Sequence, residues 1–300
     1  MAGGCGQYSH LYKKGPYSQT WHRNESLVDE EGHTTDLIAN EVVGWIEQQE
    51  TPWFYYVPFT AVHVPVEVPE QYLKMYEEGA FDSDPARDLS FRRYAAYTTH
   101  MDDAIGRILQ AVERTGQREN TLVIFTSDNG SFPSWSNRAY PGSFPDCPRL
   151  GSNLPYRGYK GQLYEGGIRV PTCVNWPGKL EPGKVDAVVH VVDWMPTLTK
   201  LTGYKPENNL MWDGMDIWPW ITGHSTPTAP RTLYWKFAGG QAAVRHGDWK
   251  LILPDKELFN LSDDPYEEQN LATTEPARVA DLLERLERAR RLDVARRPAD

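Results

Sequence analysis

A continuous apolar run at residues 121–126 ends abruptly at Asp128, Asn129 and Gly130. Because its apolar residues do not alternate with polar ones, the run predicts a strand buried on both faces, as in a parallel sheet. In open α/β folds, ligand sites lie at the ends of such strands. A carboxylate beside a carboxamide is a hard-oxygen pair suited to Ca²⁺ or Mg²⁺, although Asp-Asn-Gly is also ordinary turn chemistry.

Two successive helix-then-strand units indicate the fold class. Apolar residues at helical spacing predict helices at about 34–49 and 90–115, and apolar strands follow them at 53–57 and 121–126. This alternation predicts an α/β fold with a mainly parallel sheet flanked by helices.

The pattern changes beyond about residue 226. A last apolar strand is expected at 185–192, and afterwards short strands separated by Gly-Gly, His-Gly-Asp and Pro-Asp turns predict a small antiparallel sheet. An amphipathic helix at about 275–291 follows. We therefore predict an α/β domain at 1–226 and a C-terminal antiparallel subdomain with a terminal helix at 227–300.

Charge and composition exclude two classes of partner. A net charge of −10 argues against a nucleic-acid partner, since phosphate backbones are bound by basic surfaces. No apolar run is long enough to cross a bilayer, so no membrane association is expected. The first residues lack the charged and apolar regions of a signal peptide, which leaves the localisation open.

Three cysteines are present, and their spacing fits no zinc motif. Cys147 lies in a Pro-rich loop and is expected to be exposed, whereas Cys5 and Cys173 are expected to be buried or incidental. An odd count leaves room for one disulfide at most.

Two further segments carry candidate functional residues. His63 lies just past the predicted strand at 53–57 and could donate a proton or bind an anion, although a lone loop histidine is ordinarily structural. Lys160, between glycines, could reach an oxyanion as a point charge, with Arg157 as a second substrate-binding cation. Alternatively, Arg157, Glu165 and Arg169 form a structural ion-pair set.

Six segments follow one another in a recognisable order. They are AVHVP at 61–65, YAAYTTHMDDAIG at 94–106, TSDNG at 126–130, RGYKG with EGGIRVP at 157–171, DWMPT at 193–197, and GDWKL with ELFNLSDDP and EQNL at 247–271. Together they resemble the sulfatase family, the formylglycine-dependent sulfuric ester hydrolases of the alkaline phosphatase superfamily, which includes the arylsulfatases. The resemblance covers nearly the whole chain.

The resemblance implies a role for each candidate residue. Asp128 and Asn129 would be ligands of a divalent cation, usually Ca²⁺, with Mg²⁺ or Mn²⁺ as alternatives. His63 and Lys160 would be catalytic residues that contact the sulfate and help the leaving oxygen depart. A cation and an ammonium would neutralise the sulfuryl oxygens, while His63 would offset charge on the leaving alcohol or phenol.

The residue that makes the new bond in the family is missing from this sequence. Family members carry, upstream of these motifs, metal-binding aspartates and a Cys-x-Pro-x-Arg or Ser-x-Pro-x-Arg segment whose first residue becomes formylglycine. None of the three cysteines fits that pattern. We therefore expect an N-terminally incomplete alkaline phosphatase-like domain with no formylglycine, weak Ca²⁺ binding, and self-association through exposed sheet edges.

Three functions are compatible with the sequence. The first is a sulfatase-type hydrolase of aryl or carbohydrate sulfates, small molecules or glycans, whose activity is weak or lost without the nucleophile. The second is a phosphate monoester or diester hydrolase of the same superfamily, in which a metal-bound water replaces the nucleophile. The third is a non-catalytic glycan-binding remnant that uses the aromatic-rich loop at 132–156.

Overall fold

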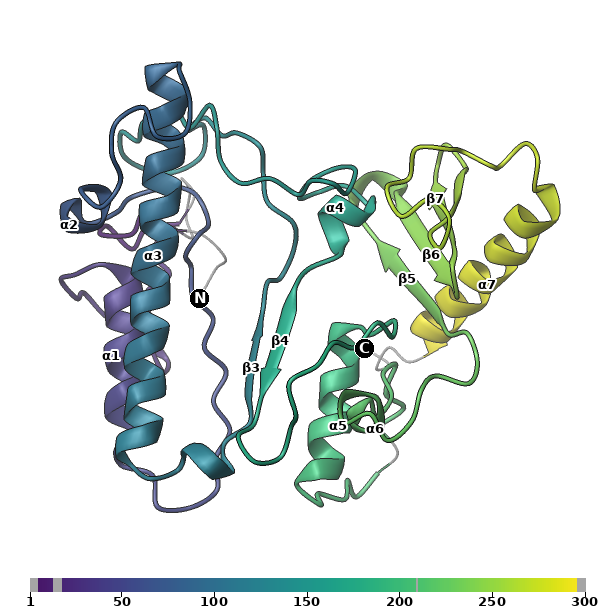
Figure 1. Cartoon of the computed structure of the whole chain (residues 1–300), viewed down its shortest axis with the longest axis horizontal. Helices are drawn as coiled ribbons and strands as arrows, with labels where there is room; N and C mark the ends of the chain where they lie inside the picture. Colours follow the sequence, from purple (N-terminus) through teal and green to yellow (C-terminus); the bar gives the residue numbers. More distant parts are fainter. Residues whose placement is uncertain (1–4, 13–17, 209, 296–300) are drawn as a thin grey trace. The chain divides into compact units, whose positions relative to one another are not determined.

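The computed structural model describes residues 5–12, 18–208 and 210–295 (Figure 1). The chain divides into two compact units. The first comprises residues 1–154 and 170–176, and the second comprises residues 155–169 and 177–300. The boundary predicted after residue 226 falls inside the second unit and stays a prediction. No helix in the described ranges has the length and hydrophobicity required to span a membrane.

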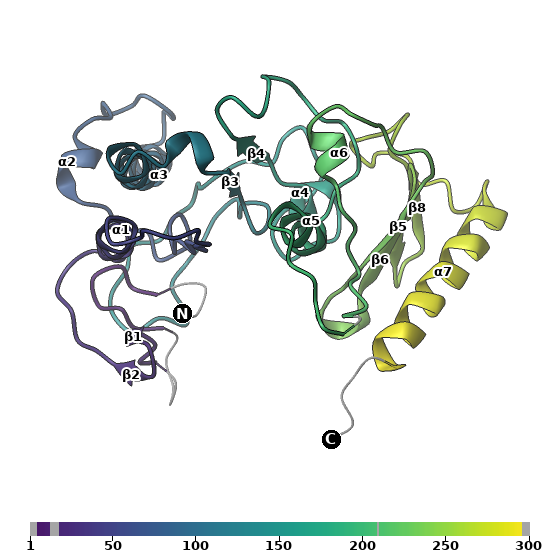
Figure 2. The ribbon, with the colours of Figure 1, turned by 90° about the horizontal axis from the view of Figure 1, so that it is seen from below.

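Helices α1 (Thr34–Ile46) and α3 (Pro85–Arg114) form the helical layer of the first unit and lie side by side (Figures 1 and 2). Both were predicted, but α3 begins earlier than expected because Asp84 caps it. The Asp84 carboxylate accepts hydrogen bonds from the amides of Ala86 and Arg87. The short α2 (Glu70–Leu73) precedes it. A buried cluster joins α1 to α3: Trp21, Ile38, Val42, Ile46, Ala111 and Val112.

The strands of the first unit differ in part from the prediction. The expected strand at 121–126 is confirmed as β3 (Val123–Thr126), which follows the 3-10 turn η1 (Arg118–Asn120) and pairs antiparallel with β4 (Thr172–Asn175). β1 (His22–Arg23) and β2 (Ser26–Leu27) form a second antiparallel pair. The described ranges combine helices with strands, as the predicted α/β class requires. Every strand pair in them is antiparallel, so the expected parallel pairing is not formed there.

The strand predicted at 53–57 is an extended segment that pairs with no other described strand. Its side chains alternate as in a strand: Trp53, Tyr55 and Val57 pack on the α1–α3 cluster, whereas Phe54 and Tyr56 are 73% and 74% exposed. The apolar pattern was recognised, but a strand also requires a hydrogen-bonded neighbour, which a local pattern cannot reveal.

The second unit contains the predicted C-terminal antiparallel sheet. The strand expected at 185–192 is absent, since these residues lead irregularly into the turn η2 (Val191–Asp193). One face of the four-stranded sheet lies against α7 (Pro276–Ala295) (Figure 2). Leu282 and Leu286 of α7 belong to the buried cluster that joins them. The elements are α4 (Glu165–Ile168), α5 (Trp194–Leu201), α6 (Trp218–Ile221), β5 (Thr232–Lys236), η3 (Ala238–Gly240), β6 (Ala242–His246), β7 (Trp249–Leu253) and β8 (Glu257–Asn260), with sheet order β5-β6-β7-β8.

Candidate functional site

Asp128 and Asn129 lie directly after β3, at the end of the strand where the sequence places them. The Asp128 side chain is exposed and Asn129 is half-buried. The hydroxyl of Ser127 donates to the backbone oxygen of Asn129 at 2.9 Å, which fixes the turn that carries both side chains. Their oxygens fit the chemistry of a hard cation, and as ligands they would supply two of the roughly six to eight oxygens that Ca²⁺ takes.

The long loop at 131–153, which follows Asn129 and Gly130, is closed by hydrogen bonds between its two ends. Ser131 and Asn153 exchange two hydrogen bonds of 2.8 Å, from the Ser131 amide to Asn153 Oδ1 and from Asn153 Nδ2 to the Ser131 oxygen. Inside the loop, Trp135 and Cys147 form an antiparallel bridge.

The cysteines differ in part from the expectation. Cys147 is buried, although it was expected to be exposed, whereas Cys173 is exposed, and all three cysteines are free. Tyr140 is only 3% exposed, so this ring is not available for stacking on a glycan.

His63 is half-buried in the loop after the extended segment. Its Nδ1 lies 2.6 Å from the backbone oxygen of Val64, and since a carbonyl only accepts, Nδ1 carries the proton. Nε2 is then the nitrogen through which the ring can gain or lose a proton. The neighbours Val64 and Val66 share a buried cluster with Cys147 and Leu150, so the structure brings the His63 loop together with the loop that follows Asp128.

Arg157 and Lys160 belong to the second unit, in the segment before α4. Lys160 is half-buried and lies between Gly158 and Gly161, whose φ angles of 86° and 90° are accessible to glycine at little cost. The convergence of Lys160 with Asp128 and His63 on one cavity stays a prediction.

The Arg157 guanidinium is engaged by its own unit. It stacks over the Tyr164 ring at 3.9 Å, donates to the backbone oxygen of Glu267 at 2.9 Å, and pairs with Glu257 at 3.3 Å. Of the predicted ion-pair set, the pair between Arg169 and Glu165 is confirmed, with Arg169 Nη1 3.7 Å from Glu165 Oε2. Arg157 pairs with Glu257 instead. Substrate binding by Arg157 stays a prediction.

Sequence reasoning missed a possible metal-binding group in the first unit. The donor atoms of His33, Asp36 and His100 lie within 4.8 Å of one another. Two imidazoles and a carboxylate suit a borderline cation such as Zn²⁺ better than Ca²⁺. The spacing of His33 and Asp36 at a helix start was visible in the sequence, but His100 lies 64 residues after Asp36, and only the packing of α3 on α1 joins them.

These donors also bind one another and their surroundings. His100 Nε2 donates to Asp36 at 3.0 Å, and Arg107 pairs with the other Asp36 oxygen at 2.7 Å. His33 Nδ1 accepts from the amide of Thr35, and its Nε2 lies 3.2 Å from a backbone oxygen. A cation at this position would have to replace part of this network, which already links α1 to α3.

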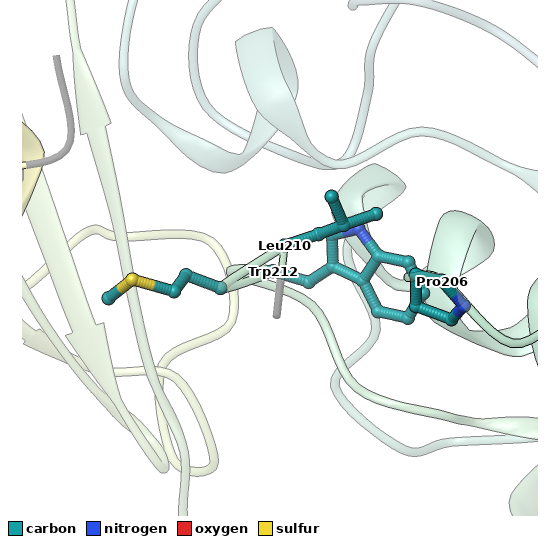
Figure 3. A pocket seen from close by; sticks show the side chains of 4 residues that line it. Pro206, Leu210 and Trp212 are labelled. Atoms are coloured by element: carbon teal, nitrogen blue, oxygen red, sulfur yellow. The ribbon is translucent and has the colours of Figure 1, made fainter. Parts of the chain in front are cut away.

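A small pocket of about 90 Å³ lies in the second unit (Figure 3). Its lining consists of Pro206, Leu210, Met211 and Trp212. None of these side chains is ionisable and none is a predicted site residue, so the pocket offers apolar contacts without chemistry of its own.

Comparison with protein families gives two matches. The family model described as "Sulfatase" matches residues 4–204, two thirds of the chain. A second model, "N-sulphoglucosamine sulphohydrolase, C-terminal", matches residues 158–292. The first match includes all five predicted site residues, and the two overlap in the segment that carries Lys160.

Curated relatives and solved structures agree with these matches. A protein named "Sulfatase" from Formosa agariphila is 33% identical over 278 residues, covering 82% of this chain and 47% of the relative. Arylsulfatase J from Mus musculus is 30% identical, covering 78% and 44%. The crystal structure of Ps i-CgsB in complex with k-i-k-neocarrahexaose has a TM-score of 0.74 and 26% identity, covering 89% of this chain and 57% of that chain.

The phosphonate monoester hydrolase of Agrobacterium radiobacter has a similar fold, with a TM-score of 0.57 and 22% identity, covering 86% of this chain and 60% of that one. The chain spans about half the length of the curated relatives it matches.

Proposed function

The chain belongs to the sulfatase family, and from that premise we propose that it carries part of a site for sulfate ester hydrolysis. The observation that supports this most directly is the family match over residues 4–204, which contains Asp128, Asn129, His63 and Lys160. The proposed part of the site binds the cation and the sulfate group. The strand-end position of Asp128 and Asn129 is compatible with this role.

Asp128 and Asn129 would hold a divalent cation through hard oxygen donors, with Ca²⁺ as the proposed ion. When bound, such a cation would withdraw charge from the sulfate oxygens. The Lys160 ammonium would bind a second sulfate oxygen as a point charge. His63 would act on the leaving oxygen: its Nδ1–H is held by the Val64 carbonyl, so a proton on Nε2 is the one it would donate.

The proposed substrate class is a carbohydrate sulfate. A structural relative was solved in complex with k-i-k-neocarrahexaose, and one matching family model is named for an N-sulphoglucosamine sulphohydrolase, which supports a sugar rather than a simple aryl group. None of the three cysteines lies in a Cys-x-Pro-x-Arg context, so the roles proposed for these side chains are limited to binding, charge neutralisation and proton donation.

Protection of Lys160 from chemical labelling tests the binding part of this proposal. Acetic anhydride is applied to the chain with Ca²⁺, with and without inorganic sulfate, and modification of Lys160 is followed by mass spectrometry. Sulfate should slow the acetylation of Lys160, and Asp128→Ala should remove the protection. Asp146→Ala, which changes an exposed carboxylate in the following loop, is the matched control. Protection that survives Asp128→Ala unchanged contradicts the proposal.

Turnover separates sulfate from phosphate chemistry. The chain is assayed with an aryl sulfate and an aryl phosphate in the same buffer. Faster release from the sulfate, reduced by His63→Ala, supports the proposed function. Faster release from the phosphate favours the phosphate ester hydrolase, which is supported by the fold shared with the phosphonate monoester hydrolase.

A further inference from the structure

A completely buried lysine lies between two buried carboxylates in the second unit. Lys250 on β7 and Glu267 are both 0% exposed, and Glu165 is 2% exposed. The Lys250 ammonium lies 2.9 Å from Glu165 Oε1 and 2.7 Å from Glu267 Oε1. The second contact is an ion pair that is not aligned as a hydrogen bond. Charges are seldom buried without a partner, and here the Lys250 ammonium is a counter-ion shared by the two carboxylates.

Glu267 attaches the segment that carries Lys160 at both of its ends. Its Oε2 accepts a hydrogen bond of 2.6 Å from the amide of Glu165, the first residue of α4. Its backbone oxygen accepts a hydrogen bond of 2.9 Å from Arg157. Lys160 therefore lies between two points that are fixed by the same residue of the C-terminal region.

The segment between these points is closed on itself. The amide of Gly166 donates to the Arg157 oxygen at 2.7 Å. A Cβ added at Gly166 would lie 2.5 Å from the oxygens of Arg157 and Gly158, so only glycine fits there. Because this bond closes the loop, its two attachments to Glu267 constrain the position of the Lys160 backbone.

Glu267 also adopts an uncommon backbone conformation. Its φ angle is +59°, in the left-handed region that non-glycine residues rarely occupy. Such a conformation persists where the surrounding contacts determine it, and it is frequent at functional sites. Here both the side chain and the backbone oxygen of Glu267 accept hydrogen bonds from the segment that carries Lys160, and the left-handed conformation allows both bonds to form.

We propose that Glu267, with Lys250 and Glu165, is a positioning group for Lys160. This inference rests on the proposed function, in which Lys160 contacts the sulfate. It assigns the C-terminal sheet a part in anion binding, since β7 contributes Lys250 and the loop after β8 contributes Glu267. Neither residue touches the substrate in this proposal.

Glu267→Gln tests the inference by removing the charge of Glu267. Glutamine keeps the shape of the side chain, and Lys250 retains Glu165 as a counter-ion at 2.9 Å. Glu268→Gln, on the exposed neighbouring residue, is the matched control. Should Glu267→Gln fail to fold, Glu267→Asp keeps the charge and shortens the reach to the Glu165 amide, and the same changes are expected.

Hydrogen exchange and Lys160 acetylation are measured on the whole chain. Glu267→Gln should speed amide exchange in residues 157–165 by about tenfold, as expected when a hydrogen bond to a charged acceptor is weakened. Exchange in α7 should stay unchanged. The acetylation rate of Lys160 should change as well, and protection by sulfate with Ca²⁺ should require about tenfold more sulfate. Glu268→Gln should leave all three quantities as in the wild type.

The outcomes distinguish the positioning role of Glu267 from the proposed sulfate-binding role of Lys160. Exchange in 157–165 that is unchanged, or that rises equally throughout the unit, overturns the positioning role. A selective rise with altered Lys160 acetylation, in a protein whose wild type shows no protection by sulfate, supports the positioning role and contradicts the proposed function. A selective rise with sulfate protection unchanged overturns the positioning role alone.

Discussion

The buried imidazole of His33 should make the first unit lose stability between neutral pH and pH 4. His33 caps α1: its Nδ1 accepts a hydrogen bond from the Thr35 amide at 3.2 Å, and its Nε2 donates to the backbone oxygen of Glu67 at 3.2 Å. Both bonds together require the neutral ring. The pKa of His33 is lowered to about 4, chiefly by burial and to a smaller extent by the neighbouring His100, while the Glu67 bond and the Asp36 carboxylate act in the opposite direction.

The sign and size of the effect follow from this pKa. Between pH 6.5 and 4 the unfolded chain binds a proton at His33 that the folded protein does not, so stability falls as the pH falls. The contribution is fully present above pH 6.5, and the loss is complete below about pH 4. At about 1.4 kcal/mol per pKa unit, the difference between 6.5 and about 4 corresponds to about 3 kcal/mol.

Urea unfolding at several pH values between 7.5 and 4, in the presence of a chelator, measures this loss. His33→Asn keeps a side-chain acceptor for the helix cap but cannot titrate. The wild type should therefore lose about 3 kcal/mol more than His33→Asn over this range. His22→Asn, on an exposed histidine of β1, should retain the wild-type slope. Equal slopes for wild type and His33→Asn, or an NMR titration of His33 near pH 6.5, would refute the reasoning.

Three further substitutions have expected outcomes. Asp193→Asn should lower the free energy of unfolding by about 3 kcal/mol in urea titrations, because Asp193 is completely buried and pairs with Arg231 through contacts of 2.6 and 2.8 Å. Gly166→Ala should lower it by about 1–3 kcal/mol, seen as a lower melting temperature, because the added methyl meets the Arg157 oxygen. Phe54→Asp should reduce the mass measured by light scattering at high concentration, if the exposed 53–57 segment mediates self-association.

The sequence predicted those elements whose signal is local. The helices at 34–46 and 85–114 carry a clear apolar stripe, and the final sheet is marked by turn residues between short apolar strands. The segment at 53–57 shows the limit of such reasoning. Its burial alternates as in a strand, but strand pairing depends on a neighbour that local sequence does not specify.

The candidate site also contains residues that local sequence could place and contacts that it could not. Asp128 and Asn129 could be placed at a strand end because an apolar run stops just before them. The link from Glu165 to Lys250 and Glu267 could not be predicted, since it joins residues 85 and 102 positions apart. Glu165 and Lys250 lie inside segments that resemble the family, and Glu267 directly precedes one, but those segments give no indication that one lysine pairs with both carboxylates.

The proposed role of Asp128 and Asn129 as cation ligands implies an expected affinity for calcium. Two donors at an exposed strand end supply few of the ligands that Ca²⁺ takes, so the described residues support a weak site, with a dissociation constant of about 1 mM. At about 1 mM Ca²⁺ such a site would stabilise the fold by about 0.4 kcal/mol. The melting temperature should then rise by no more than about 2 °C, and Asp128→Ala should abolish that rise.

Tight binding would require a different assignment. A rise in melting temperature above about 5 °C with Ca²⁺, lost in Asp128→Ala, would contradict a weak two-ligand site and would mean that other groups complete the shell around this strand end. A comparable rise with Zn²⁺, lost in His100→Ala and retained in Asp128→Ala, would place the metal at His33, Asp36 and His100. The two cations therefore distinguish an oxygen site at the end of β3 from a mixed nitrogen and oxygen site between α1 and α3.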